Sequence, residues 1–208
     1  MSAVTFWGGA IHVALRRLRD GFDVETDALI VRVDQVTLEA KEFVTLEGLR
    51  NPGERFSLVA GPESPWRTFE TIGGPLSNPP EKSSALVRLD LSTGAWSKLV
   101  DGRAMNAFVV SHTLDNDGGF AILADYDADR LNPTRLVRFS NDGRVTREIL
   151  RTSGYNLWRV DRLGAGELLV AERSSLAYGI RVFGLDGREV GRVDTLLPPY
   201  DFEVYRDE

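Results

Sequence analysis

Cysteine is absent from the 208-residue chain. This absence excludes a disulfide framework, a thiolate nucleophile and a zinc site built on cysteine. Histidine is scarce as well, because only His12 and His112 occur, and neither is accompanied by a Gly-x-Ser-x-Gly elbow. A Ser-His-Asp site would need one of these two residues and finds no supporting motif. The motifs therefore point to no particular catalytic activity.

Long apolar runs are also missing. No stretch approaches the roughly 20 residues that a membrane-spanning helix needs, and the first residues lack the basic start and apolar core of a signal peptide. We therefore expect a cytoplasmic protein that has no membrane partner. Apolar residues make up 42% of the chain and charged residues 27%, which is typical of an ordinary globular protein that needs no covalent staple.

Lysine is the rarest charged residue in the chain. Lys41, Lys82 and Lys98 are the only lysines, so arginine supplies the rest of the 25 basic residues, against 31 acidic ones. The resulting formal charge of −6 argues against non-specific nucleic-acid binding, which needs a basic face that neutralises phosphates. The planar guanidinium suits carboxylate or phosphate recognition. Codon usage in a GC-rich genome is the favoured interpretation of the arginines, because they are spread along the whole chain.

A β-hairpin recurs along the sequence. Residues 86–100, 136–150 and 180–193 each contain an alternating strand, a tight turn closed by glycine and a second alternating strand. The glycine supplies the positive φ that such turns require. A fourth copy at 29–46 keeps the alternation but lacks the glycine. Short strands that repeat every 40 to 50 residues or so are the signature of a propeller.

Another strand pair precedes each of the two later hairpins, which makes four strands in a repeat. The sequence therefore predicts an all-β fold, a β-propeller-like array of about four four-stranded antiparallel blades in a single domain. The approximate blade limits are 4–48, 55–101, 106–151 and 156–195. Residues 10–19 fit a helix or a strand, and the repeat favours the strand. The tail 200–206 is predicted to close the ring or to add a strand to a partner's edge.

The last repeat carries a family resemblance. Residues 157–172 form an apolar strand, a glycine turn and a second apolar strand that ends in an acidic residue, and Arg181-Val-Phe then leads to an Asp-Gly turn. This order resembles an NHL-type repeat, most clearly over 106–195. The resemblance implies a β-propeller of the six-bladed kind, yet only four blades are countable. A small closed ring would solve this shortfall, and so would a homodimer in which two chains share one ring.

Two loops are the expected binding surfaces, at 61–82 and 125–134. Their candidate ligand-binding residues are Trp66, Arg67, Tyr126 and Arg130. A rigid ring presents several loops together, so we expect a non-enzymatic scaffold that binds a protein partner or a small ligand. A third hypothesis is a carbohydrate-binding module, in which tryptophans such as Trp66 serve as stacking platforms.

An acidic cluster supports a different hypothesis. Asp125, Asp127 and Asp129 alternate after an apolar strand, and their oxygens suit calcium, although the run lacks the glycine and the glutamate of an EF-hand. A resemblance to lactonase-type propellers implies a divalent ion bound by Asp125, Glu172 and Asn106, which would polarise a lactone carbonyl. A metal-dependent hydrolase is therefore the main alternative to the scaffold. A solvated acidic loop is the simpler interpretation, and no other cofactor is expected.

Overall fold

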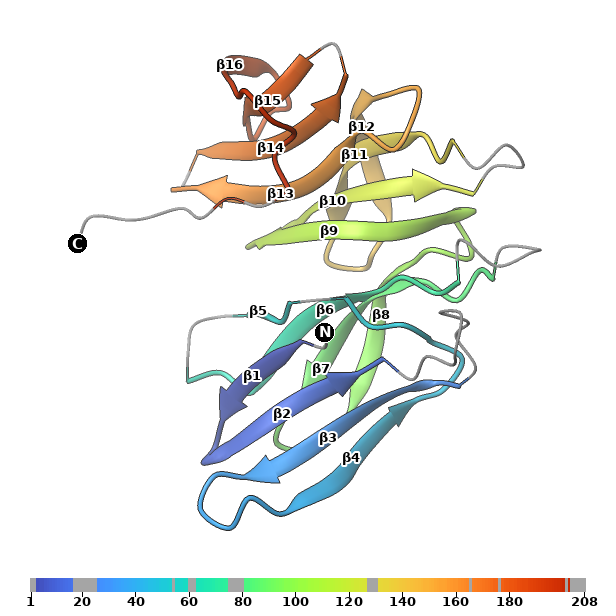
Figure 1. The fold of residues 1–208 in the computed structure, drawn as a ribbon, viewed down its shortest axis with the longest axis vertical. Coiled ribbons are helices and arrows are strands. Elements are labelled where there is room, and N and C mark those ends of the chain that lie inside the picture. The colour runs from blue at the N-terminus through green and yellow to red at the C-terminus, as the bar shows by residue number, and fades with distance from the viewer. Residues whose placement is uncertain are drawn as a thin grey trace. The chain divides into compact units, whose positions relative to one another are not determined.

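The computed structural model describes residues 3–16, 26–53, 55–59, 63–74, 81–126, 131–164, 166–175, 177–200 and 202. All regular structure in these residues is β, arranged as four antiparallel four-stranded sheets in which sequence neighbours pair (Figure 1). Within the described ranges, no helix is long and apolar enough to cross a membrane. The chain divides into two compact units, residues 1–109 and 110–208, and each is described by itself.

Two sheets belong to the first unit. The first sheet contains β1 (Val4–Trp7), β2 (Ala10–Leu15), β3 (Ala28–Asp34) and β4 (Ala40–Leu46). The second contains β5 (Ser57–Leu58), β6 (Trp66–Thr71), β7 (Ala85–Asp90) and β8 (Trp96–Asp101). The interpretation of 10–19 as a strand is correct over β2, which pairs with both β1 and β3. Residues 17–19 lie outside the described residues.

The remaining two sheets follow the same order. The third contains β9 (Ala107–Asp115), β10 (Gly118–Asp125), β11 (Thr134–Ser140) and β12 (Val145–Arg151). The fourth contains β13 (Leu157–Leu163), β14 (Glu167–Ser174), β15 (Ala177–Gly184) and β16 (Glu189–Asp194). The predicted all-β array of four four-stranded antiparallel sheets is thereby confirmed.

Each unit has a hydrophobic core of its own. In the first unit the core side chains come mainly from the two middle strands of each sheet: Ala14, Ile30, Phe69, Val87 and Leu89 are all fully buried. In the second unit they come from the corresponding strands of the later sheets: Phe120, Ile122, Leu136, Leu168 and Val170. Middle strands lie between hydrogen-bonded neighbours and carry apolar residues on their packed face, so they hold most of the buried side chains.

The hairpin turns confirm the glycine pattern. The positive φ angles are 77° at Gly94 and 79° at both Gly143 and Gly187. In the second sheet the Gly94 amide donates to the Asp90 carbonyl at 2.8 Å, four residues back. In the third and fourth sheets the corresponding bond spans three residues, as in Gly143 to Ser140 at 2.7 Å. The turn therefore occurs in two lengths.

The first sheet contains the longer turn without its glycine. The Leu38 amide donates to the Asp34 carbonyl at 3.0 Å, and Leu38 adopts a φ of 58° with a side chain that is 71% exposed. A leucine in this left-handed region is strained by its Cβ, which glycine lacks. Leu38 thus occupies the place that Gly94 occupies in the second sheet.

Replacing Leu38 with glycine is expected to stabilise the protein. Leu38→Gly removes the strain and should raise the free energy of unfolding by about 1 kcal/mol, net of the entropy cost of glycine. Urea denaturation measures the change. Val36→Gly is the matched control, because Val36 lies in the same turn, is 90% exposed and lies outside the left-handed region. It should lower stability, and equal effects of the two changes would contradict the strain at Leu38.

The described part of the tail packs on the fourth sheet. The Arg173 guanidinium lies over the Tyr200 ring at 3.8 Å and over the Trp158 ring at 4.6 Å. Arg159 lies over the Phe202 ring at 4.8 Å. Tyr200 and Phe202 belong to no strand, and the other residues of the predicted closing strand 200–206 lie outside the described residues. Ring closure through this tail stays a prediction.

Candidate functional site

Three chain connections meet at one end of the second sheet. In an antiparallel meander, the segment that enters the first strand, the connection between the second and third strands, and the segment that leaves the fourth strand all lie at the same end. Here these are the described parts of 47–56 and 72–84, together with 102–106. The strand order alone therefore brings residues more than 50 positions apart in the sequence to a common edge.

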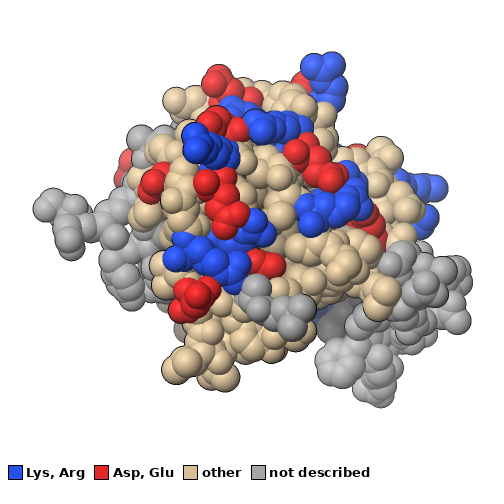
Figure 2. Space-filling model, turned by 90° about the horizontal axis from the view of Figure 1, so that it is seen from above, with Lys and Arg blue, Asp and Glu red and all other residues tan. Residues whose placement is uncertain are grey.

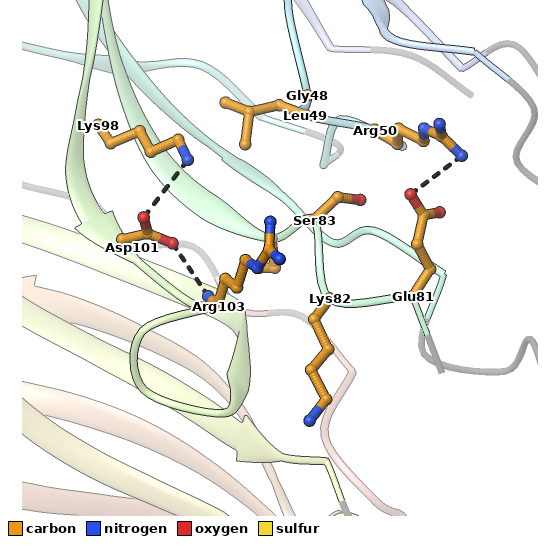
Figure 3. Close-up of a pocket in the computed structure, with 10 residues that line it drawn as sticks. Gly48, Leu49, Arg50, Glu81, Lys82, Ser83, Lys98, Asp101 and Arg103 are labelled. Atoms are coloured by element: carbon orange, nitrogen blue, oxygen red, sulfur yellow. Dashed lines mark hydrogen bonds and ion pairs between the residues drawn. The ribbon is translucent and has the colours of Figure 1, made fainter. Parts of the chain in front are cut away.

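A pocket of about 600 Å³ opens at this edge (Figure 3). Its charged lining is predominantly basic: Arg50, Lys82, Lys98 and Arg103 against Glu81 and Asp101. Gly48, Leu49, Ser83 and Ser84 complete the wall. Four basic and two acidic side chains make the pocket positive, whereas the chain as a whole carries a charge of −6.

A tight turn holds Arg103 on the wall of the pocket. The Gly102 carbonyl accepts from the Ala107 amide at 3.0 Å. A Cβ on Gly102 would lie 2.4 Å from the Ala107 carbonyl oxygen, so only glycine fits there. Asn106 adopts a φ of 50°, a conformation that asparagine tolerates better than most residues. The Arg103 amide donates to Asp101 Oδ1 at 3.0 Å, which fixes the base of the arginine.

The opposite wall is built from ion-paired residues. Arg50 Nη1 lies 3.0 Å from Glu81 Oε1, and Arg50 Nε lies 3.8 Å from Asp27 Oδ1. The backbone of Glu81 is itself fixed, because its amide donates to the Gly74 carbonyl at 2.9 Å and its carbonyl accepts from the Gly74 amide at 3.2 Å. Arg50 therefore has its charge balanced by neighbouring carboxylates.

The other basic side chains of the pocket have different partners. Lys98 Nζ lies 3.4 Å from Asp101 Oδ2, and Lys82 Nζ donates to the neutral amide oxygen of Asn106. The Arg103 guanidinium makes no hydrogen bond or ion pair with any residue in the described part of the chain. Figure 3 shows it in the space between Lys98 and Ser83. A guanidinium with all its donors open to a positive cavity is suited to bind an anion.

Trp66 and Arg67, the first predicted ligand residues, begin β6 and so lie at the end of the sheet opposite the pocket. Arg67 is 1% exposed and donates to Thr5 Oγ1 at 3.0 Å and to the carbonyls of Ser64 and Phe6 at 2.6 and 3.2 Å. Burial lowers the pKa of its guanidinium. Most hydrogen-bond donors of Arg67 are therefore used within the protein, by backbone carbonyls and by Thr5.

Trp66 is partly covered by a neighbouring cation. The Arg88 guanidinium lies 4.4 Å from the centroid of the Trp66 ring. The predicted role of Trp66 as a sugar-stacking platform stays a prediction, which loss of glycan binding in Trp66→Ala would support.

The second predicted surface, 125–134, lies largely outside the described residues, including Asp127, Asp129 and Arg130. Tyr126 is described and is 7% exposed. Asp125 accepts two ion pairs, with Arg135 Nε at 2.9 Å from Oδ1 and Arg151 Nη1 at 2.7 Å from Oδ2. Both of its carboxylate oxygens therefore already face a guanidinium.

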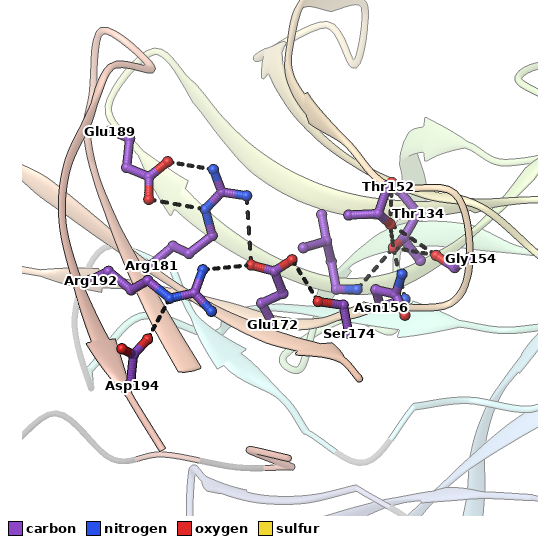
Figure 4. Close-up of polar contacts among 11 residues, drawn as sticks. Thr134, Thr152, Gly154, Asn156, Glu172, Ser174, Arg181, Glu189, Arg192 and Asp194 are labelled. Atoms are coloured by element: carbon purple, nitrogen blue, oxygen red, sulfur yellow. Dashed lines mark hydrogen bonds and ion pairs between the residues drawn. The ribbon is translucent and has the colours of Figure 1, made fainter. Parts of the chain in front are cut away.

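Glu172 has a comparable environment (Figure 4). Its Oε2 lies 3.1 Å from Arg192 Nη1 and 3.6 Å from Arg181 Nη1, and its Oε1 accepts from Ser174 Oγ at 3.2 Å. Asn106, the third predicted ligand, accepts from Lys82. A calcium ion would have to compete with these cations for the same oxygens. Among the described residues no group of three or more histidine or acidic side chains is placed to bind a metal, and the calcium site stays a prediction.

The loop prediction and the pocket overlap only at Glu81 and Lys82, the end of the 61–82 loop. Sequence reasoning missed Arg50, Lys98 and Arg103, which come from separate connections. One signal was present in the sequence: two of the three lysines, Lys82 and Lys98, line this one pocket. Because arginine supplies most of the other basic residues, the presence of two lysines at one pocket is a signal for the site.

The charges are mixed on the face shown in Figure 2, where basic and acidic side chains lie next to one another. The ion pairs of Arg135, Arg151 and Arg181 with acidic neighbours are of this kind. The pocket differs because its basic residues outnumber its acidic ones.

No protein-family model matches the chain, and no curated protein matches it either. Solved structures do match. An exo-β-1,3-galactanase from Phanerochaete chrysosporium, solved with galactose, is 11% identical with a TM-score of 0.52, and the match covers 93% of this chain and 49% of that one. A prolyl endopeptidase is 10% identical with a TM-score of 0.57, and the match covers 95% of this chain and 27% of that one.

These similarities establish the fold alone. The neighbours have β-propeller-type folds, so the fold of this chain is β-propeller-like. The chain spans about half the length of the galactanase and about a quarter of the endopeptidase. The NHL type of the repeat, and the closure of the ring by four blades or by a second chain, stay predictions.

Proposed function

We propose that the protein is a propeller-like binding module that takes a small anionic ligand in the pocket at the end of the second sheet. The observation that carries the proposal is the Arg103 guanidinium, which lies in a pocket of about 600 Å³ and bonds to no described residue. A cavity of this size is in the range of small-molecule sites. Positive charge in a concave site concentrates anions there.

The acidic residues of the pocket are paired with its basic residues. Glu81 is ion-paired with Arg50 and Asp101 with Lys98. Both carboxylates already contact cations of the lining, so the pocket offers a ligand mainly positive charge and hydrogen-bond donors.

The metal-dependent hydrolase and the carbohydrate-binding module have less support. They depend on Asp125, Glu172 and Trp66, and each of these side chains contacts arginines of the same chain. A protein partner remains an alternative occupant of the pocket if it presents an acidic side chain. The small anion is preferred because the cavity volume of about 600 Å³ is in the range of small-molecule sites.

Removing the free guanidinium is expected to abolish most of the anion binding. Citrate, titrated into the full chain by isothermal calorimetry at low salt, should bind the wild type at the pocket. Arg103→Ala should weaken binding by about tenfold or more, since a charge-assisted hydrogen bond contributes about 1.5 to 3 kcal/mol. Lys98→Met should weaken it by a smaller factor, because Asp101 already balances that ammonium.

Lys41→Met is the matched control. Lys41 is the one lysine outside the pocket, and its side chain is 80% exposed. Its removal changes the net charge by the same unit as Lys98→Met but should leave citrate affinity within twofold. Equal losses in Lys41→Met and Arg103→Ala would show that citrate responds to net charge alone and would overturn the proposal.

A further inference from the structure

The middle strands of the first sheet, β2 and β3, carry apolar side chains on both faces. On one face, Ala14 and Ile30 belong to the core of the first unit and are fully buried. Side chains paired across antiparallel strands share a face, so Phe6, Ile11 and Val33 lie together on the other face. Ile11 and Val33 are partly exposed, and Phe6 is 62% exposed.

The same apolar surface continues along the strands. Val13 pairs with Val4 of β1 and with Val31 of β3, and all three side chains are at least partly exposed. We call this surface the first outer face, made of Val4, Phe6, Ile11, Val13, Val31 and Val33. An antiparallel sheet with one solvated face usually alternates apolar and polar residues. An apolar outer face therefore indicates that another surface covers it.

The fourth sheet has a comparable surface, the fourth outer face, made of Leu169, Ile180, Val182 and Val193. Val182 pairs with Leu169, and Ile180 pairs with Val193. Their strand neighbours Leu168 and Phe183 point the other way and belong to the core of the second unit. The described tail residues contact arginines of β13 and β14, whereas this face extends over β15 and β16, where Val193 is 60% exposed.

We infer that a second copy of this chain covers both surfaces, with the first outer face of each chain packed on the fourth outer face of the other. A partner that covers one face leaves the second in water. Two copies joined in this way cover all four faces through two identical contacts. Such a head-to-tail contact is heterologous, and it closes when the second copy returns to the first. The inference is independent of the anion pocket.

The area of the two faces agrees with a dimer that has two such contacts. A sheet of four strands, spaced about 4.8 Å apart and about 20 Å long, covers roughly 400 Å². A stable interface takes about 800 Å² from each partner. One outer face alone is therefore too small, and the two outer faces of a chain together reach the required area.

Light scattering of the full chain at micromolar concentration should give the mass of two chains. Val13→Lys and Val182→Asp each place an unpaired charge in both contacts of their own dimer, so each variant should have the mass of one chain. An equimolar mixture of the two variants should recover the mass of two chains. In the mixed dimer one contact is unaltered, and the other brings the lysine and the aspartate together.

Val36→Asp is the matched control, because Val36 is 90% exposed on a turn outside both outer faces; this variant should remain a dimer. Phe6→Lys and Val193→Asp repeat the test at side chains that are 62% and 60% exposed, in case a central substitution disturbs folding. A wild type with the mass of one chain would overturn the inference. A dimer that Val13→Lys dissociates and Val182→Asp leaves intact would show two first outer faces paired with each other and would overturn the head-to-tail arrangement.

Discussion

Thr134→Val is expected to lower the free energy of unfolding by about 2 to 3 kcal/mol. Thr134 begins β11 and is fully buried, and its hydroxyl accepts from the backbone amide of Leu157 at 2.9 Å (Figure 4). The same hydroxyl lies 2.8 Å from that of Thr152 and donates to the Gly154 carbonyl at 3.1 Å. Valine has nearly the same shape but leaves these buried groups without their partner, and that loss destabilises the folded state.

The hydroxyl of Thr134 joins the third sheet to the first strand of the fourth. We therefore expect the substitution to weaken the protection of this strand as well as the stability of the whole fold. Hydrogen exchange of the Leu157 amide, followed by mass spectrometry, measures it directly. Thr134→Ser keeps the hydroxyl and should cost only about the burial of one methyl group, about 1 kcal/mol. Thr146→Val is an exposed control, expected to stay within about 0.5 kcal/mol of the wild type. A loss of stability in Thr134→Val that is no larger than the change in Thr146→Val would contradict the role of the hydroxyl.

Acid is expected to destabilise the first unit through His12. This side chain is fully buried on β2, and neither ring nitrogen has a hydrogen-bond partner among the residues that the structure describes. Burial lowers the pKa of His12 from 6.5 to about 4, and the positive charges of Arg32 and Arg67 act in the same direction. The Phe43 ring packs against the imidazole edge to face, with 5.2 Å between the two ring centroids.

The direction of the pH dependence follows from this lowered pKa. Between pH 6.5 and about 4, the unfolded chain binds a proton at His12 that the folded chain does not bind. The free energy of unfolding therefore falls as the pH falls through this window, by about 3 kcal/mol once the pH is below the folded pKa. Urea denaturation at pH 7, 5.5 and 4.5, followed by tryptophan fluorescence, measures this slope.

His12→Leu should remove that part of the acid sensitivity. Leucine has a similar volume and carries no unpartnered nitrogen, so stability at pH 7 should be retained or increased. His112→Gln is the matched control, because it removes the other histidine and leaves His12 in place. An unchanged acid slope in His12→Leu would show that the loss arises from other groups.

The strand pattern could be predicted because it depends on local chemistry. Asp-Gly at 142–143 and 186–187 requires a positive φ and so marks a hairpin wherever the flanking strands alternate. Residues 10–15 were ambiguous because Ile11 and Leu15 suit one face of a helix as well as one face of a strand. Pairing with β1 and β3 resolved the ambiguity, and such pairing is a tertiary property that periodicity does not contain.

The candidate site could not be predicted in the same way. Arg50, Lys98 and Arg103 come from separate segments, and only the order of the strands places them around one pocket. Arg67 was a reasonable candidate as a basic residue beside a tryptophan, but its donors serve backbone carbonyls whose positions depend on another strand. Whether an arginine is free or already bound is decided by the fold.

The two lengths of hairpin turn indicate where the chain tolerates a change in length. The turns of the first and second sheets close over four residues, and those of the third and fourth close over three. The same division separates the two compact units. The two lengths differ by one residue, and the order of the strands is the same in all four sheets. These turns are therefore positions that we expect to accept a single-residue insertion or deletion.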